Sequence, residues 1–515
     1  MTRNHARKVL LISADQWRGD HLGALGDTGV KTPNLDRLLA EGTGFVRHYA
    51  STAPCGPARA SLLTGLYAMN HRSVRNGTPL DDRHTNIARE VRRTGVEPVL
   101  FGYTDTSADP RGRATDDPAL CRYQGVLPGF SIGCDFADDR LDPWLAVLRA
   151  AGYPIPDDPD AIYQPVADYP DSDGRGHSYP PPVYRAEHSD TAFVADQVLN
   201  YMAVNRHSDW LIHAVFLRPH PPLYAPEPYN RLYDPTLIAP PVRLPDWQQE
   251  AAQHPYLGYW LEQQALPGQY TGHPVNCRDL PDHEIAQMKA SYRGLISEVD
   301  YHIGRLIEQL KASGDYDRTL IVFTVDHGEM LGDHWLFGKG GYFEASYHIP
   351  LIIRDPYRTA GHGRRISQFT EAVDIMPTVL DWLGVEIPVT CDGCSLQPFL
   401  EGDSPDYWRN EVHWEFDFRD IVDLHCEQAL GLTSDQCNLN VIRDQYYKYV
   451  HFNALPPLLF DLQRDPHEFV NRANDPDYQL QMLYYAQKLL SWRMAHADRT
   501  LTHQLLTPDG PIRRG

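Results

Sequence analysis

The stretch Pro54-Cys55-Gly56-Pro57-Ala58-Arg59-Ala60-Ser61-Leu62-Leu63-Thr64-Gly65 places a cysteine directly before a predicted short helix. Pro57 suits the first helical turn, where its missing N–H costs no hydrogen bond, and Gly65 suits the left-handed residue that closes a helix. A helix N-terminus carries unpaired N–H groups and a partial positive charge, which favour an anion. We therefore predict that Cys55 is a nucleophile position, although a single cysteine at a helix start is more commonly a structural thiol.

Three short apolar runs have the composition of buried strands, and each is followed by residue types that carry out chemistry. These runs are residues 9–12 before Asp15, residues 211–217 before His220 and residues 320–325 before Asp326. Helical patterns over 34–41 and 283–310 alternate with them. The alternation predicts an α/β fold with a large, mostly parallel central sheet between helices, whose ligands bind beyond the carboxyl ends of the strands.

The strand ends supply a candidate metal site. Asp15 follows the first strand, and Asp326-His327 follows a later one, so two carboxylates and an imidazole can meet Cys55 around one divalent ion. Each residue alone has a simpler interpretation, the aspartates as helix caps and the histidine as an ordinary hydrogen-bonding group.

The cysteine motif outweighs those interpretations. Cys-x-Pro-x-Arg followed by Ala-Ser-Leu-Leu-Thr-Gly resembles the signature of the sulfatase branch of the alkaline phosphatase superfamily, and residues 55–65 match it completely. The resemblance implies that a formylglycine-generating enzyme oxidises Cys55 to formylglycine. The hydrated aldehyde would supply the attacking hydroxyl, and the reaction would pass through a covalent intermediate on formylglycine.

Two departures from the common sulfatase pattern refine the prediction. Asp15-Gln16 and Asp326-His327 replace Asp-Asp and Asp-Asn, which resembles phosphonate monoester hydrolases and promiscuous arylsulfatases of the same branch. An amide in place of a carboxylate removes one charge, worth about 4 kcal/mol at about 4 Å with an effective dielectric near 20. Two carboxylates then neutralise one divalent ion, so a singly charged ester is favoured over a dianion. The histidine favours Mn²⁺, Fe²⁺ or Zn²⁺ over Ca²⁺, and we favour Mn²⁺.

The resemblance also implies roles for residues outside the metal site. Arg59 would orient formylglycine, Lys339 would hold a substrate oxygen, and His220 would assist the leaving group or the breakdown of the hemiacetal. Substrate contacts are expected from Gln16, Asn76, Tyr103 and Asp105. Asp105 stands where the related hydrolases place a threonine, and its carboxylate would repel an anionic ester unless it points away, is neutralised by Arg111 or Arg113, or marks another substrate preference.

Composition limits the partners. The chain of 515 residues has a formal net charge of −21, which argues against nucleic acid and anionic membranes as partners. The polar residues 1–8 and the lack of a long apolar run predict a cytoplasmic protein. Eight scattered cysteines form no disulfide framework, and we expect Cys391 and Cys394 to be reduced thiols rather than a zinc or redox site.

We expect a catalytic domain over 1–384 and a smaller C-terminal α+β domain over 385–515. Segments near 138–187 and 225–282 have the composition of insertions, either covering the site or forming mobile surface loops. The resemblance suggests a homotetramer, with the C-terminal tail as a candidate contact.

The predicted activity is hydrolysis of phosphonate monoesters and phosphodiesters, with sulfatase activity as a secondary property. One alternative makes an aryl or alkyl sulfate the principal substrate. Another is a non-catalytic anion-binding scaffold in which Cys55 remains a thiol.

Overall fold

The computed structural model describes residues 7–26, 29–137, 140–266 and 274–513. Within them, a nine-stranded sheet runs in the order β11-β2-β10-β9-β1-β6-β4-β5, with β12 paired to β2. The strands of this sheet are β1 (Lys8–Asp15), β2 (Thr43–Tyr49), β4 (Glu97–Gly102), β5 (Ser131–Asp135), β6 (Trp210–Pro219), β9 (Thr319–Val325), β10 (His348–Arg354), β11 (Arg364–Ile366) and β12 (Thr370–Glu371). Only β10 runs against its neighbours, which confirms the predicted mostly parallel sheet.

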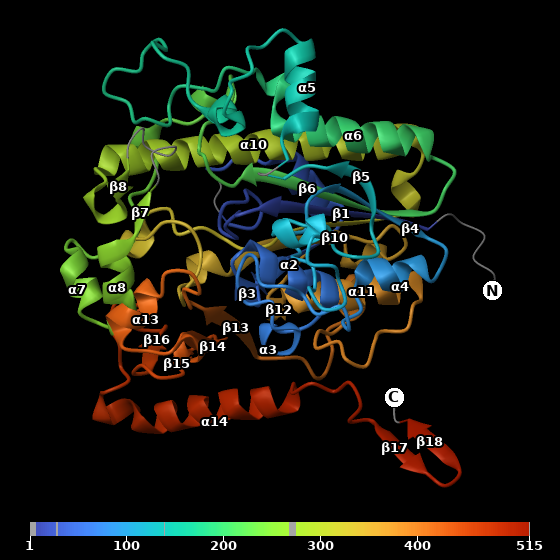
Figure 1. Cartoon of the computed structure of the whole chain (residues 1–515), viewed down its shortest axis with the longest axis vertical. Coiled ribbons are helices and arrows are strands. Elements are labelled where there is room, and N and C mark those ends of the chain that lie inside the picture. Colours follow the sequence, from blue (N-terminus) through green and yellow to red (C-terminus); the bar gives the residue numbers. More distant parts are fainter. Residues whose placement is uncertain (1–6, 27–28, 138–139, 267–273, 514–515) are drawn as a thin grey trace.

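Helices cover both faces of this sheet. In Figure 1, the long α10 and α6 lie across one face, while α2, α4 and α11 lie on the other. The helices are α1 (Pro33–Ala40), α2 (Cys55–Thr64), α3 (Ala68–His71), α4 (Ile87–Arg92), α5 (Asp142–Ala150), α6 (Asp190–Val204), α7 (Trp247–Ala251), α8 (Pro255–Gln263), α10 (Asp282–Ser313), α11 (Ile375–Leu383), α12 (Gln397–Leu400), α13 (His425–Leu430) and α14 (Gln479–Ala495). The α/β prediction is therefore confirmed.

A second, five-stranded sheet lies beside the first, and its strand order is β16-β15-β14-β13-β3. Four antiparallel strands come from the C-terminal part: β13 (Glu411–Asp417), β14 (Asn438–Asp444), β15 (Tyr447–Phe452) and β16 (Leu458–Asp461). The fifth, β3 (Thr52–Ala53), pairs with β13 and leads directly into α2. The smaller sheet thereby holds the segment that carries Cys55. The boundary near residue 384 stays a prediction.

Near the C-terminus, a helix packs on the small sheet and a hairpin follows it. Helix α14 lies below the small sheet in Figure 1, and β17 (Gln504–Thr507) pairs with β18 (Gly510–Arg513) beyond it. A further two-stranded pair joins β7 (Ala265–Leu266) to β8 (Val275–Asn276). Among the described residues, no helix combines the length and apolar character that crossing a bilayer requires.

The two predicted insertions have some regular structure. The first contains α5 and short helical turns, and the second contains α7 and α8. Residues 138–139 and 267–273, which belong to these segments, lie outside the described residues. Tyr163 and Tyr184 of the first segment are buried against the main body, so this part of the segment belongs to the core.

Candidate active site

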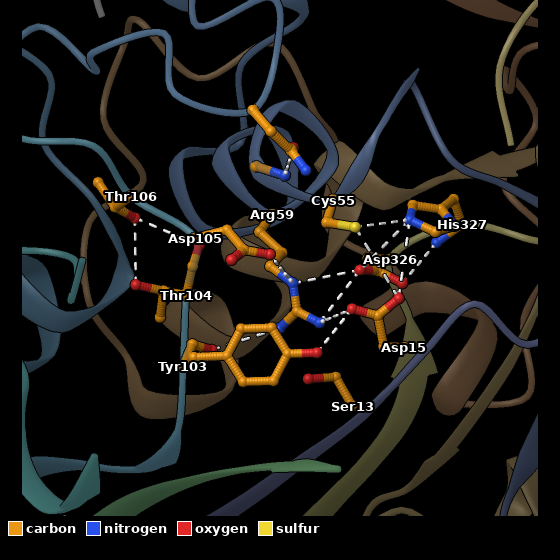
Figure 2. A network of polar contacts seen from close by, with 12 residues as sticks. Ser13, Asp15, Cys55, Arg59, Tyr103, Thr104, Asp105, Thr106, Asp326 and His327 are labelled. Atoms are coloured by element: carbon orange, nitrogen blue, oxygen red, sulfur yellow. Dashed lines mark hydrogen bonds and ion pairs between the residues drawn. The ribbon is translucent and has the colours of Figure 1, made fainter. Parts of the chain in front are cut away.

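The ends of two neighbouring strands and the start of one helix form the centre of the site. Strands β1 and β9 pair in parallel with Ala14 opposite Val325, so the next residues, Asp15 and Asp326, leave the sheet at the same edge. Candidate ligand atoms of Asp15, Cys55, Asp326 and His327 all lie within 4.8 Å of one another, and all four residues are buried. The four predicted metal ligands are thus brought together, as Figure 2 shows.

The imidazole of His327 is fixed with one nitrogen directed into this cluster. Its Nδ1 donates to the carbonyl of Gly328 at 3.0 Å, which leaves Nε2 3.2 Å from Cys55 Sγ. Burial lowers the pKa of His327, so the neutral imidazole has a lone pair on Nε2. Gly328 is required here because a Cβ would collide with the carbonyl of Ala345.

The cysteine occupies the first turn of α2 rather than the position before it. The helix starts at Cys55 after Pro54 and ends at Gly65, whose φ of 67° is the left-handed conformation predicted for it. Burial raises the pKa of Cys55 well above its usual value, and the carboxylates of Asp15 and Asp326 add to this effect. Here burial and acidic neighbours outweigh the helix dipole, so the unmodified thiol is protonated and a poor nucleophile.

Arg59 ties the acidic groups together from the second turn of α2. Its Nη2 lies 3.0 Å from Asp15 Oδ2 and 3.1 Å from Asp326 Oδ2, and its Nε lies 3.5 Å from Asp105 Oδ2. All four side chains are at most 3% exposed. Figure 2 shows the guanidinium between the three carboxylates. The positive charge of Arg59 is therefore paired with carboxylates of the protein itself.

Tyr103 also binds Asp15. The Tyr103 hydroxyl donates to Asp15 Oδ2 at 2.6 Å, and the Arg59 guanidinium stacks 4.3 Å from the centre of its ring. Burial alone would raise the pKa of Asp15, but positive neighbours outweigh it and hold that pKa well below its usual value. His220 and Arg59 lead these positive neighbours, and Lys339 adds to their effect. Asp15 is thereby held as a carboxylate.

The partner of Asp105 differs from the two predicted ones. Arg111 pairs with Asp81 and Asp109, and Arg113 pairs with Asp117, so neither of them neutralises Asp105. Arg59 takes that place because Asp105, with a φ of 50°, turns back toward α2. The local sequence, with two nearby arginines, could not indicate a partner 46 positions away.

Gln16 connects a carboxylate to the predicted substrate lysine. The Nε2 of Gln16 donates to Glu329 Oε2, and its Oε1 accepts from Lys339 Nζ at 2.5 Å. Glu329 also accepts from the backbone N–H groups of Leu331 at 3.0 Å and Gly338 at 2.6 Å. Sequence reasoning missed Glu329, although it lies only two residues after the predicted ligand His327.

The other two predicted residues lie at the edge of the cluster. Half-buried His220 follows β6, and its Nδ1 donates to the Pro221 carbonyl at 2.8 Å. Its charge acts on Asp15, which places it beside the metal cluster. Asn76 accepts a hydrogen bond from the N–H of Gly56 at 2.9 Å and so caps the start of α2. The described cysteines, including Cys391 and Cys394, form no disulfide.

Comparisons with known proteins show the family of this chain. The family model for sulfatases matches residues 7–385, and the model for the C-terminal region of N-sulphoglucosamine sulphohydrolase matches residues 332–495. Multifunctional alkaline phosphatase superfamily protein PehA from Trinickia caryophylli is 43% identical over 521 residues, covering 99% of each chain. An arylsulfatase from Clostridium perfringens is 26% identical, covering 94% of this chain and 93% of the relative.

Two solved structures are similar to this chain over nearly its whole length. Phosphonate monoester hydrolase of Agrobacterium radiobacter is 47% identical with a TM-score of 0.94, covering 99% of this chain and 100% of the other. Phosphonate monoester hydrolase from Silicibacter pomeroyi is 43% identical with a TM-score of 0.92 and 99% coverage of both chains. This chain therefore belongs to the sulfatase family of the alkaline phosphatase superfamily, and it is an ester hydrolase rather than a non-catalytic scaffold.

Proposed function

We propose that this enzyme hydrolyses phosphonate monoesters and phosphodiesters, with formylglycine made from Cys55 and one divalent metal ion, and that it acts on sulfate esters as a secondary activity. The observation that carries the proposal is the buried cluster of Asp15, Cys55, Asp326 and His327 within 4.8 Å. Similarity to two phosphonate monoester hydrolases over nearly the whole chain supports the substrate class.

The donor set fits a divalent ion. Two carboxylates and an imidazole whose Nε2 lone pair is directed into the cluster face one point, and a modified residue 55 would face the same point. Carboxylates with one imidazole suit Mn²⁺, which we favour, while Zn²⁺, Fe²⁺ and Ca²⁺ are the other candidates. When bound, the ion would stabilise negative charge, and hydrated formylglycine would supply the hydroxyl nucleophile.

The side chains around this cluster would hold the ester and move protons. Lys339 is a cation at the edge of the cluster and would hold a nonbridging oxygen of the substrate. His220 donates from Nδ1 to a backbone carbonyl, so its Nε2 is the atom that would carry a proton to or from the leaving group. Arg59, which binds both ligand carboxylates, would hold them in place and would orient formylglycine.

Substrate contacts are proposed for Gln16, Tyr103, Asn76 and Asp105, each with a defined anchor in the structure. Gln16 is held between Glu329 and Lys339, and Tyr103 is held by Asp15. Asn76 binds the first turn of α2. Asp105 is bound to Arg59, so its charge acts on the site through that pair.

The charges of the site favour a monoanion. The carboxylates of Asp15, Asp105, Asp326 and Glu329 would balance a divalent ion together with Arg59 and Lys339, so the site with its metal would be neutral. A phosphonate monoester or phosphodiester would then add one negative charge to a buried site. A phosphate monoester dianion would add two, which is less favourable.

A second candidate is a sulfate ester as the principal substrate. A sulfate monoester also carries one charge, and the similarity to an arylsulfatase favours this candidate. Purified enzyme produced together with a formylglycine-generating enzyme, and loaded with Mn²⁺, should be assayed with phenyl phosphonate esters, phosphodiesters, aryl sulfates and aryl phosphate monoesters. The proposal predicts the highest kcat/KM for the phosphonate ester or diester. A higher kcat/KM for the aryl sulfate would establish the second candidate.

We further propose that the enzyme works as a homo-oligomer, a tetramer by resemblance, in the cytoplasm, with a formylglycine-generating enzyme as its maturation partner and without nucleic acid or membrane partners. Apolar side chains exposed along α14 and the C-terminal hairpin support an oligomer: Leu480, Leu483, Tyr484, Met494, Leu505, Leu506 and Ile512. Light scattering of the full chain should give a mass several times that of one chain, and a monomer would contradict the proposal.

A further inference from the structure

A charged cluster outside the metal site lies beneath the loop that carries His220. Arg218, near the end of β6, is 1% exposed. Its Nη1 donates to the carbonyl of His220 at 2.8 Å and to the carbonyl of Pro222 at 3.1 Å. The guanidinium therefore binds the backbone on both sides of Pro221, whose own carbonyl accepts the Nδ1 proton of His220.

The guanidinium is itself held by an acid. Arg218 Nε donates to Asp190 Oδ2 at 3.0 Å, and both side chains are at most 2% exposed. Asp190 lies at the start of α6 and also accepts from the N–H of Thr191 at 2.7 Å. A carboxylate at this end of a helix is favoured by the helix dipole. The direction of the guanidinium is thus set by α6, a rigid element of the fold.

Tyr163, which belongs to the first predicted insertion, covers this ion pair. Tyr163 stacks on the guanidinium at 4.5 Å from the ring centre, and its hydroxyl donates to Asp190 Oδ2 at 3.3 Å. An ion pair this deeply buried adds little to stability compared with well-packed apolar side chains. Its geometry points to another use, because Arg218, besides binding Asp190 and Tyr184, donates two hydrogen bonds from Nη1 to the His220 loop.

We propose that Arg218, fixed by Asp190 and covered by Tyr163, is a positioning residue that directs Nε2 of His220 toward the oxygen of the leaving group. The inference rests on the proposed role of His220 in the reaction. It also gives Tyr163 a function, since Tyr163 contacts both members of the ion pair that binds the His220 loop.

The test uses Asp190→Asn and a series of aryl phosphonate monoesters whose phenols differ in acidity. A misdirected proton donor harms poor leaving groups most, because good leaving groups depart without protonation. We expect kcat/KM to fall by about 30-fold for the least acidic phenol and by less than about threefold for the most acidic one, well within the contribution of general acid catalysis. A merely structural role would lower kcat/KM equally across the series, and that result would overturn the proposal.

Two further variants keep the test decisive. Asp196→Asn is a matched control, because Asp196 also lies on α6 and pairs with an arginine, Arg305, at 2.7 Å, but at the protein surface. It should leave every kcat/KM unchanged. Tyr163→Phe keeps the ring on Arg218 and removes only the hydroxyl, so it should show the same leaving-group pattern with a smaller loss even if Asp190→Asn folds poorly. Equal losses across the series in Tyr163→Phe would count against the proposal.

His220→Ala separates failure of this inference from failure of the proposed function. If His220→Ala shows the steep leaving-group pattern and Asp190→Asn does not, Arg218 is not the positioning residue, while the role of His220 stands. If His220→Ala itself shows no such pattern, the proposed role of His220 fails and the inference fails with it. If both show the pattern, the double variant should be no worse than His220→Ala, because the two residues act through one proton.

Discussion

Replacing Glu329 by glutamine should disrupt the site without changing its shape. The side chain is 3% exposed and accepts three hydrogen bonds, two from backbone N–H groups at Oε1 and one from Gln16 at Oε2. In Glu329→Gln, the amide oxygen must stay with the two N–H groups, so the new NH₂ group faces the NH₂ group of Gln16. Two donors then oppose each other.

Rotation of Gln16 cannot relieve this conflict. If its amide turns over, its oxygen faces the new NH₂ group, but its own NH₂ group then faces the ammonium of Lys339, which now lies 2.5 Å from Gln16 Oε1. One hydrogen bond to a charged group is lost in either orientation. Such a bond is worth about 1.5–3 kcal/mol, which corresponds to a fall in kcat/KM of about 10- to 150-fold.

The assay is kcat/KM for an aryl phosphonate monoester with metal-loaded enzyme that carries formylglycine. Glu90→Gln is the matched control, because Glu90 is also a buried glutamate, 5% exposed, but binds Thr85 and Arg93. We expect that control to retain full activity. An unchanged kcat/KM in Glu329→Gln, with both variants folded by circular dichroism, would refute the reasoning that Glu329 orients Gln16 and Lys339.

Three other perturbations test separate parts of the structure. Tyr103→Phe removes the 2.6 Å hydrogen bond to Asp15 and should lower kcat/KM by about 10-fold or more; unaltered kinetics would show that this bond is dispensable. Chelation of the divalent ion should lower both activity and Tm, because three buried carboxylates then lose the two positive charges of the ion, and Mn²⁺ should restore both; a Tm indifferent to chelator would argue against a metal in this cluster. Burial, with smaller effects from His84 and Arg72, lowers the pKa of His71 to about 3, so the unfolded chain gains a proton below about pH 6.5 that the folded chain does not. The contribution of this residue to the free energy of unfolding should therefore fall by about 1.4 kcal/mol per pH unit between pH 6.5 and 3. In urea unfolding, His71→Gln should gain stability relative to the parent protein as the pH falls from 7 to 4. A stability difference that stays constant over this pH range would contradict the prediction.

The parts of the site that lie at strand ends could be predicted from sequence. The apolar runs before Asp15, His220 and Asp326 form parallel strands, which end at the same edge of the sheet. The polar residues that follow them therefore lie together at that edge. Pro57 and Gly65 likewise predicted the bounds of α2. The predicted start lies within two residues of the observed one, and the predicted end is correct. These features depend on the local sequence and on the alternation of strands and helices along the chain.

The electrostatic partners could not be predicted in the same way. The bond between Gln16 and Glu329 joins residues 313 positions apart, and Asp105 finds Arg59 instead of the nearer Arg111. The high pKa of Cys55 depends on burial and on carboxylates from two strands, neither of which its own helix reveals. Such properties arise only once the chain is folded, because they are sums over neighbours in space.

Mass spectrometry of the peptide that contains residue 55, taken from an active preparation, tests the central claim most directly. The claim is that Cys55, whose buried thiol is protonated and unreactive, works only after conversion to formylglycine beside Asp15, Asp326 and His327. The account predicts that the aldehyde or its hydrate is present and that its fraction rises in proportion to specific activity. An active enzyme in which residue 55 is entirely an unmodified cysteine would contradict it.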